Sequence, residues 1–386
     1  MIPYARQSIS PADIDAVCDV LRSDWLTQGP AIGRFESGVA DYCNARHAVA
    51  LHSATSALHL SCLALGLQAG DWLWTSTNTF VASANCARYC GANVDFVDID
   101  PDTYNISVDA LRDKLVRAEK EGVLPKIVVP VHFAGHPCDM AAIADLAQRY
   151  GFRVVEDASH AIGAESLSGK VGNCRYSDVT VFSFHPVKIL TTGEGGMILT
   201  NDDTVAKRLR LLRTHGITRD PREMIKENPD PWWYEQIELG FNYRMTDIQA
   251  ALGSSQLVRL DEFISRRAHL AKRYQLLLRE LPIKLPTERP AVKSSWHLYV
   301  INVDVKKAGL SRRQVYDSMR EHGVAVNVHY IPVHLQPYYR ALGYGEGHCP
   351  VAEKYSEQAL SLPLFFALTD SEQDTVVDVL RKALRA

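Results

Sequence analysis

The chain has 386 residues, with 42 Lys and Arg against 45 Asp and Glu, which gives a formal net charge of −3. Hydrophobic residues make up 46% and charged residues 23%, a balance typical of globular proteins and not of a disordered tail, a collagen-like repeat or a small disulfide scaffold. The near-neutral charge excludes a strongly basic surface, so we expect no nucleic-acid partner and no anionic membrane partner.

The eight cysteines are too sparse for a disulfide framework and match no metal-binding spacing. Cys86 and Cys90 lie four residues apart, and no CxxC occurs. The nearest metal-like group comprises His132, His136 and Cys138 in HFAGHPC. A turn after a buried strand explains this group better, so we predict no metal site.

The sequence contains no evident targeting or membrane segment. The first ten residues, MIPYARQSIS, lack the basic start and apolar stretch of a secretory signal. The range His47–Gly70 has no Lys, Arg, Asp or Glu, but histidines, hydroxylated residues and glycines interrupt it. A strand, a turn and a helix fit it better than a membrane span. We therefore expect a cytoplasmic protein with reduced thiols.

Helix signals open the chain. Ser10 can cap a helix, Pro11 suits its first turn, and Asp13 favours its positive end. Apolar residues then recur at helical spacing up to Leu21. The following stretch, SDWLTQGP, is typical of extended chain.

Short apolar runs alternate with helical patterns from about His47 to Thr200. The expected strands are Ala48–Leu51, Trp72–Thr75, Val94–Val97, Ile127–Val131, Val154–Glu156, Val179–Phe184 and Met197–Thr200. The expected helices are Ser56–Leu65, Val81–Tyr89, Val108–Lys120 and Ala141–Tyr150. This alternation predicts a mainly parallel sheet with helices on both faces, which binds ligands at the carboxyl ends of its strands.

The second half of the chain predicts a smaller α+β domain. We expect a surface excursion at Ile217–Glu238 and a long helix from Thr246 to about Leu278. Two further helices should end the chain, after a strand at Trp296–Val303, a helix at Arg312–His322 and a strand at Ala325–Val328. We therefore divide the chain into a large α/β domain, residues 1–265, and a small α+β domain, residues 266–386.

The sequence does not match the familiar nucleotide-binding motifs. The glycines of GAESLSGK are six residues apart instead of five, and no GxGxxG opens a helix after a strand. A different group lies where the strands are predicted to end. In SATSALHL, the first amides of a helix and the hydroxyls of Thr55 and Ser56 suit a phosphate, although simple helix capping remains an alternative.

Two charged residues follow predicted buried strands. Asp157 could be a turn former, or a carboxylate that holds a cationic ring nitrogen. Lys188 precedes a glycine-rich turn, which places it well to lose its proton and form a Schiff base. Phe80 could stack on a ring, or could pack in the core. Together these features match the requirements of pyridoxal phosphate, which also accounts for the phosphate-binding helix start.

The chain resembles the DegT/DnrJ/EryC1/StrS family of sugar aminotransferases over nearly its whole length. Matching stretches include LTQGP, SATSALHL, TFVASANC, ANVDFVDID, EDASHAIGA, SFHPVK, TTGEGG, NYRMTDIQAALG and HYIPVH. The resemblance implies an aspartate-aminotransferase-like fold of type I, an α/β class. It also implies a ping-pong reaction, in which pyridoxal phosphate accepts the amino group of L-glutamate and, as pyridoxamine phosphate, passes it to C4 of a UDP-linked 4-keto-6-deoxy sugar.

The resemblance assigns roles to individual residues. Lys188 would carry the cofactor and move protons, and Asp157 would keep the ring nitrogen protonated. The cofactor's remaining contacts would be Thr55, Ser56, Phe80, His160, Ser183 and, from the partner subunit of a homodimer, Asn242. His160 would lie near the cofactor's 3-hydroxyl, where the family often has glutamine.

For the sugar nucleotide the resemblance indicates Tyr4, Asp24, Trp25, Leu26, Thr27, Ala54, Ser183, Asn242, His329, Tyr330, Ile331 and Pro332. As alternatives, Tyr4 could be a terminal packing residue, and His329 and His334 could be structural. Two other functions remain as alternatives. A related dehydratase branch has histidine in place of Lys188, and a regulator would bind the cofactor without turnover.

Overall fold

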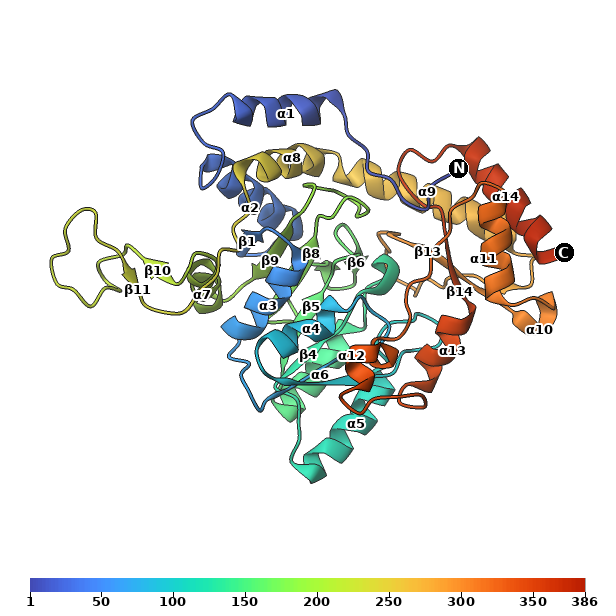
Figure 1. The fold of residues 1–386 in the computed structure, drawn as a ribbon, viewed down its shortest axis with the longest axis horizontal. Helices are drawn as coiled ribbons and strands as arrows, with labels where there is room; N and C mark the ends of the chain where they lie inside the picture. Colours follow the sequence, from blue (N-terminus) through green and yellow to red (C-terminus); the bar gives the residue numbers. More distant parts are fainter. Residues whose placement is uncertain (386) are drawn as a thin grey trace.

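The structure, a computed structural model, describes residues 1–385, and Figure 1 shows a large and a small sheet joined along one side by helices. The helices are α1 (Pro11–Leu21), α2 (Pro30–Cys43), α3 (Ala54–Ala64), α4 (Ala82–Tyr89), α5 (Val108–Glu121), α6 (Met140–Tyr150), α7 (Asp203–Arg213), α8 (Asp247–Val258), α9 (Leu260–Leu278), α10 (Val305–Ala308), α11 (Arg312–Glu321), α12 (Pro337–Arg340), α13 (Pro350–Gln358) and α14 (Asp370–Arg385). Two short 3₁₀ segments, Phe133–Gly135 and Val333–Leu335, complete the helical elements of this range.

The large sheet has seven strands in the order β1-β9-β8-β5-β4-β2-β3. They are β1 (His47–Leu51), β2 (Trp72–Ser76), β3 (Asn93–Val97), β4 (Ile127–Val129), β5 (Arg153–Asp157), β8 (Val179–Ser183) and β9 (Gly196–Thr200). Strand β9 runs antiparallel to both of its neighbours, and the other pairs are parallel. The predicted mainly parallel sheet is confirmed, with every strand and helix expected between residues 47 and 200 present to within two residues.

Both faces of this sheet are covered by helices. Leu73 and Val155 point to the face on which α3, α4 and α7 pack. Trp74 and Val154, their neighbours along the strands, point to the opposite face, which α5 and α6 cover. Because successive side chains of a strand alternate between faces, Asp157 points toward α3 and α4 and Glu156 toward α5 and α6. This alternation therefore places the two neighbouring carboxylates on opposite faces of the sheet.

The small sheet is antiparallel, with the order β12-β13-β14. Its strands are β12 (Ile283–Lys284), β13 (Tyr299–Val303) and β14 (Ala359–Leu362). Side chains of α9, α11 and α14 pack on it in one apolar cluster. The predicted domain division after residue 265 falls within α9.

Three predictions for the second half are wrong. Three helices, α12, α13 and α14, follow Val328 in the part of the chain that the structure describes, where two were expected, because Pro337 starts the four-residue helix α12 before α13. The predicted single helix at 246–278 is two helices, because Arg259 has φ −102° and ψ 6° and bonds back only three residues, to the carbonyl of Gln256. The predicted strand Ala325–Val328 is irregular. It has isolated bridges on its two sides, from Val324 to Ile2 and from Asn327 to Ser361, so no ladder extends along it. Strand β14 takes the place beside β13 instead.

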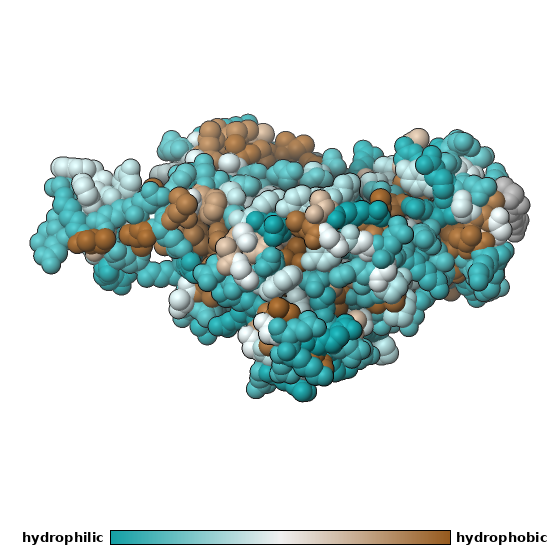
Figure 2. Space-filling view, turned by 60° about the horizontal axis from the view of Figure 1, so that its bottom comes forward, coloured by the Kyte–Doolittle hydropathy of each residue, from teal (hydrophilic) through white to brown (hydrophobic). Residues whose placement is uncertain are grey.

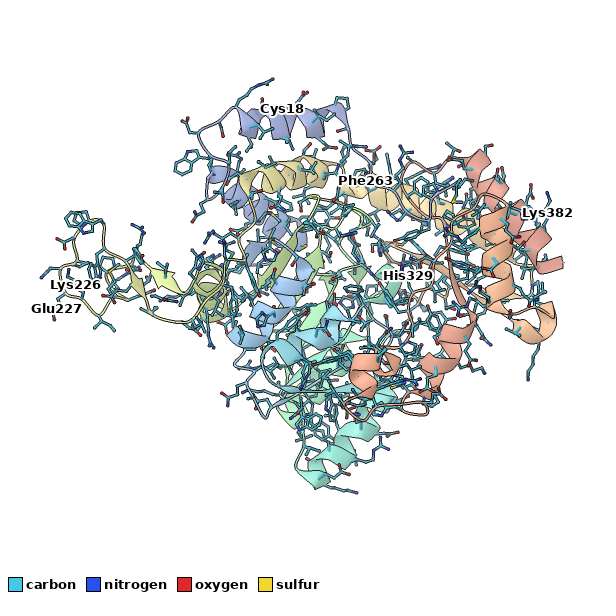
Figure 3. All side chains as sticks on the ribbon, viewed as in Figure 1. Cys18, Lys226, Glu227, Phe263, His329 and Lys382 are labelled. Atoms are coloured by element: carbon cyan, nitrogen blue, oxygen red, sulfur yellow. The ribbon has the colours of Figure 1, made fainter. Side chains whose placement is uncertain are left out.

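A two-stranded arm projects from the body of the molecule. It comprises β10 (Ile217–Thr218), β11 (Glu235–Gln236) and the loop between them, which agrees with the predicted surface excursion. Lys226 and Glu227 lie at its tip (Figure 3). Ile225 and Trp232 are exposed on the arm, and Figure 2 shows brown, hydrophobic patches on the arm. The remaining short hairpin is β6 (Glu165–Ser166) with β7 (Gly169–Lys170), and no helix among residues 1–385 is long and apolar enough to cross a membrane.

Candidate active site

Lys188 lies in the loop that follows β8. The base of this loop is closed by the N–H of Phe184, which donates to the carbonyl of Gly195 over 2.9 Å. A Cβ on Gly195 would lie 2.1 Å from Oγ1 of Thr192, so the turn accepts only glycine there. Burial lowers the pKa of Lys188 to about 8, against the attraction of Asp157, which raises it. An appreciable fraction of the amine is therefore neutral near pH 7 and can act as a nucleophile or a base.

Asp157 ends β5 and is 5% exposed. The hydroxyl of Ser83 donates to Oδ2 of Asp157 over 2.5 Å, and the N–H of Ser159 donates to Oδ1 over 3.1 Å. Both donors are neutral, so these hydrogen bonds leave the carboxylate free to pair with a cation within the site. Lys188 is near enough for this charge to raise its pKa.

Helix α4 brings two more residues to this point. Ser83 lies in its first turn, and Phe80 lies just before it with 59% of its surface exposed. An exposed phenyl ring just before the helix turn that bonds Asp157 suits stacking on a planar ligand. Phe80 is among the residues predicted from the sequence and Ser83 is not, although Ser83 follows Phe80 by only three residues and lies in the first turn of α4.

The start of α3 lies across from the end of β8. The helix begins at Ala54, two residues earlier than predicted, and Ser53 caps it by accepting from the N–H of Ser56. Gly196 pairs with Ser183 and touches the helix start so closely that a Cβ would lie 2.6 Å from the nitrogen of Ala54. Ser183 and the first amides of α3 are thereby brought together, which suits a dianionic phosphate.

The two hydroxyls predicted for the phosphate differ in their surroundings. Ser56 is 4% exposed and its hydroxyl donates to the carbonyl of Ser53 over 2.7 Å. Thr55 is half-buried. Among residues 1–385, the amides of Ala54 and Thr55 have no hydrogen-bond partner, so they are free to bind an anion.

His160 has a defined tautomer. Its Nδ1 accepts the N–H of Ala134 over 3.3 Å, so the ring proton lies on Nε2, which is 3.2 Å from the hydroxyl of Tyr330. Burial, together with the positive charge of Lys188 and the neighbouring His329, lowers the pKa of His160 well below its ordinary value. The imidazole is therefore neutral at physiological pH.

Two further histidines lie beside this one. His297, which the sequence analysis missed, has its ring centre 4.4 Å from that of His160, and its pKa is well below the ordinary value because of burial and nearby cations. His329 has its pKa lowered to about 4 by burial and by Lys188. Figure 3 shows His329 between the large and small sheets. The imidazoles around Lys188 are thus held neutral.

The segment His329–Pro332 also reaches the N-terminus. The rings of Tyr4 and His329 lie 5.8 Å apart, and the N–H of Leu364 donates to the carbonyl of Tyr4 over 3.1 Å. Ile331 is 58% exposed. His334, by contrast, is fully buried between Thr77, 2.6 Å away, and Glu353, 2.9 Å away, which is a structural position.

Two other groups of predicted residues lie in different segments of the chain. Asp24–Thr27 is exposed, and Thr27 pairs with Thr246. Asn242 is exposed and pairs with Thr214. Its neighbour Tyr243 accepts the N–H of His52 over 3.1 Å, which places this segment beside the turn that leads into α3.

The residues present fit pyridoxal phosphate. The free amides of α3 suit its phosphate, Asp157 its ring nitrogen, Phe80 a ring face, and the partly neutral amine of Lys188 its carbonyl. No group of three or more His, Cys, Asp or Glu side chains within residues 1–385 is arranged to hold a metal ion.

The fold and this constellation define an aminotransferase of fold type I that depends on pyridoxal phosphate. The chain matches the model of the DegT/DnrJ/EryC1/StrS aminotransferase family over residues 7–381, and it belongs to that family. It is accordingly a sugar aminotransferase, as the resemblance predicted.

Individual relatives align over almost the whole chain. The spore coat polysaccharide biosynthesis protein SpsC of Bacillus subtilis is 39% identical over 100% of this chain and 97% of its own length. The structure of Helicobacter pylori PseC, an aminotransferase of pseudaminic acid biosynthesis, superposes with a TM-score of 0.90 at 28% identity over 99% of both chains. The pyridoxamine-phosphate form of the sugar aminotransferase Spr1654 of Streptococcus pneumoniae superposes with a TM-score of 0.89 at 29% identity, over 100% of this chain and 99% of that one.

Proposed function

We propose that the protein transfers the amino group of L-glutamate to C4 of UDP-2-acetamido-2,6-dideoxy-β-L-arabino-hex-4-ulose. The product would be UDP-4-amino-4,6-dideoxy-N-acetyl-β-L-altrosamine, an intermediate of the pseudaminic acid pathway. The observation that carries the transamination is Lys188, whose pKa of about 8 and proximity to Asp157 suit a group that both accepts and donates a proton. Similarity to PseC over 99% of both chains supports the particular sugar.

The chain's own residues would divide the work of both half-reactions. Pyridoxal phosphate, when bound, supplies a carbonyl that accepts the amino group and a ring that accepts electrons from the reacting carbon. Nζ of Lys188 takes the proton from the donor carbon in one half and returns a proton to C4 of the sugar in the other. Asp157 holds the proton on the ring nitrogen, and Ser83 holds Asp157.

The substrate would lie against the loop His329–Pro332 and Tyr4. These residues line one side of the Lys188 region with neutral aromatic and imidazole rings. Such surfaces bind sugar rings by stacking and leave their hydroxyls to hydrogen bonds. Asp24–Thr27, Ala54 and Ser183 complete the nucleotide-sugar contacts in this proposal.

The working unit in this proposal is a cytoplasmic homodimer whose active sites are shared. Asn242 is exposed in its own chain, beside the turn into α3, so a two-fold partner could present it to the opposite phosphate site. The division into domains of residues 1–265 and 266–386 belongs to the same proposal.

The test is to supply L-glutamate with UDP-4-keto sugars of the L-altro and D-gluco series side by side. We expect amination of the former with at least tenfold higher kcat/KM. A preference for the D-gluco series would favour a second candidate, another nucleotide-linked 4-keto-6-deoxy sugar. If L-glutamate leaves the absorbance of the bound cofactor unchanged, the transamination proposal itself is wrong and a regulator without turnover is favoured.

A further inference from the structure

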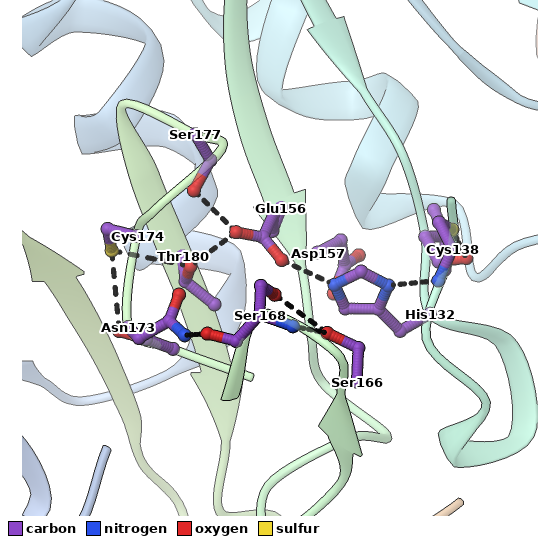
Figure 4. Close-up of polar contacts among 12 residues, drawn as sticks. His132, Cys138, Glu156, Asp157, Ser166, Ser168, Asn173, Cys174, Ser177 and Thr180 are labelled. Carbon is purple, nitrogen blue, oxygen red and sulfur yellow. Dashed lines mark hydrogen bonds and ion pairs between the residues drawn. The ribbon is translucent and has the colours of Figure 1, made fainter. Parts of the chain in front are cut away.

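A buried polar network lies directly behind Asp157, on the opposite face of the sheet. Figure 4 shows Glu156 between His132 on one side and Ser177 and Thr180 on the other, with Asp157 next to it along β5. His132 is fully buried and Glu156 is 5% exposed. The mechanism above uses neither of them.

Glu156 is held from both neighbours of β5. Nε2 of His132 lies 2.6 Å from Oε2 of Glu156, and the hydroxyl of Thr180, on β8, donates to Oε1 over 3.0 Å. The hydroxyl of Ser177 also donates to Oε1. Burial favours the neutral acid, but these hydrogen bonds outweigh it and lower the pKa of Glu156. The side chain is therefore a carboxylate that joins three segments.

The tautomer of His132 follows from its second contact. Burial lowers the pKa of His132, but Cys138 and Glu156 raise it to about 10. The hydrogen bond decides the tautomer, because the N–H of Cys138 donates to Nδ1 over 3.0 Å and a nitrogen that accepts this bond carries no proton. The single ring proton lies on Nε2 and is donated to Glu156. His132 thus connects the turn at Cys138 to the carboxylate.

The backbone of Asp157 depends on the same segment. Its N–H donates to the carbonyl of Pro130 over 2.9 Å, and its carbonyl accepts the N–H of His132 over 3.1 Å. These two bonds form an isolated parallel bridge between Val131 and Asp157, which lies beyond the regular pairing of β4, a strand that ends at Val129, with β5. The side-chain contact between His132 and Glu156 lies at the point where the ladder has ended.

We propose that His132 and Glu156 form a clamp that positions Asp157 beneath the ring nitrogen of the cofactor. The clamp fixes residues 130–132 against the end of β5 and ties Glu156 to β8 on the other side. His132 and Glu156 are positioning residues that act through the backbone of Asp157. This inference rests on the proposed role of Asp157 toward the ring nitrogen.

The matched pair His132→Asn and His132→Gln tests the clamp. The asparagine amide can occupy the place of Nδ1 and keep the contact with Cys138, but it does not reach Glu156. The glutamine amide reaches the place of Nε2 and can donate to Glu156, but it loses the contact with Cys138. A general packing role of His132 would make the two variants similar.

The first readout needs no cofactor. In the cofactor-free protein we expect the amide of Asp157 to exchange its hydrogen at least tenfold faster in His132→Asn, and within twofold of wild type in His132→Gln. The second readout is the ¹⁵N shift of ring-labelled pyridoxal phosphate bound to each variant. His132→Asn should lower the fraction of cofactor whose ring nitrogen is protonated and should raise the cofactor's Kd at least fivefold. In His132→Gln both quantities should be close to those of wild type.

Controls separate the clamp from loss of stability and from the role of Asp157. Ile143 belongs to the same apolar cluster as Cys138. Ile143→Ala is the control for stability, because it should lower Tm while leaving His132 and Glu156 unchanged. The clamp is refuted if Ile143→Ala reproduces the faster exchange at an equal fall in Tm, if His132→Gln behaves like His132→Asn, or if both remain like wild type. Asp157→Asn should change the ring-nitrogen shift, and if it does not, the role of Asp157 fails while the exchange data still judge the clamp.

Should the His132 variants not fold, the double variant Ser177→Ala, Thr180→Val opens the clamp from the β8 side. It removes both hydroxyls that bind Oε1 of Glu156. We expect the same direction of change, with at least threefold faster exchange at Asp157. Exchange at the wild-type rate would contradict the proposal.

Discussion

The hydroxyl of Ser83 donates a hydrogen bond of 2.5 Å to Oδ2 of Asp157, and both side chains are buried. The bond joins the first turn of α4 to the end of β5, two elements separated by more than seventy residues of sequence. Ser83 in turn contacts Thr79, whose hydroxyl lies 2.8 Å away, next to Phe80. One short hydrogen-bonded chain thus connects the candidate ring-nitrogen partner to the residue expected to stack on the ring.

Ser83→Ala should therefore weaken catalysis without unfolding the protein. A hydrogen bond to a charged group contributes about 1.5–3 kcal/mol, and its loss would let Asp157 bind a proton or rotate. We expect kcat to fall about tenfold, with a smaller change in KM. Ser61→Ala, which removes a buried hydroxyl that bonds only to the carbonyl of Ala57, is the matched control. Equal kcat values for Ser83→Ala and wild type would show that this bond is dispensable.

Lys188→Ala should abolish turnover while the cofactor still binds. In the proposed site α3, Phe80 and Asp157 would hold the phosphate and the ring, and this change leaves them intact. We expect a folded protein that binds pyridoxal phosphate, lacks the absorbance of a lysine-linked cofactor and shows no measurable transamination. Retained transamination of the keto sugar would exclude Lys188 as the essential base.

The cofactor-free protein should report the lowered pKa of Lys188 through its stability. Lysine has an ordinary pKa of 10.5, and burial lowers that of Lys188 to about 8. Between these values the unfolded chain binds the proton and the folded chain does not, so stability rises as pH increases from 8 to 10.5. At pH 7 the folded state carries a penalty of about 3 kcal/mol from this group.

Lys188→Met removes this contribution, so the comparison isolates it. Below pH 8 we expect Lys188→Met to have a higher free energy of unfolding than wild type. This difference should shrink steadily as the pH rises toward 10.5. Urea titrations of both cofactor-free proteins across this range measure it. A difference that does not change with pH would mean that Lys188 titrates normally in the folded chain.

Much of the large domain was predictable because its signals are local. Buried strands are short apolar runs and their connecting helices have clear periodicity, so the order of elements between His47 and Thr200 followed from the sequence. Helices α2 and α7 were missed although both have legible signals, Pro30 at the first turn of α2 and Asp202 as the cap of α7. Strand β14 was not legible locally, because Ala359–Leu362 is defined by its partner β13.

The site was predictable where a residue type is tied to its chemistry, as with Lys188 and Asp157. Ser83 and His297 were missed because a serine in a helix and a histidine near a strand are common, and only tertiary contacts bring them to Asp157 and His160. The pair of His132 and Glu156 was missed for the same reason. A turn was predicted at His132, but its partner is 24 residues away on another strand.

The surroundings of Asn242 indicate whether it acts in its own chain or on a partner subunit. Asn242 does not cap the helix that follows it, because Thr246 itself caps α8 in a reciprocal pair with Gln249. Asn242 is exposed, and its segment runs beside the turn into α3. An exposed amide next to an anion site is well placed to act on a second copy of the chain.

Asn242→Ala should therefore lose activity, and co-refolding it with Lys188→Ala should restore part of that activity. The two defects lie on opposite sides of a shared site, so each mixed dimer contains one site with an intact lysine and an intact partner asparagine. If the subunits mix randomly, half of the dimers are mixed and each has one good site, so activity should approach about a quarter of wild type. Exchange of subunits is verified by native mass spectrometry of differently tagged chains. A mixture as inactive as its parents, despite verified exchange, would place Asn242 outside the partner's site and restrict it to a role in its own chain.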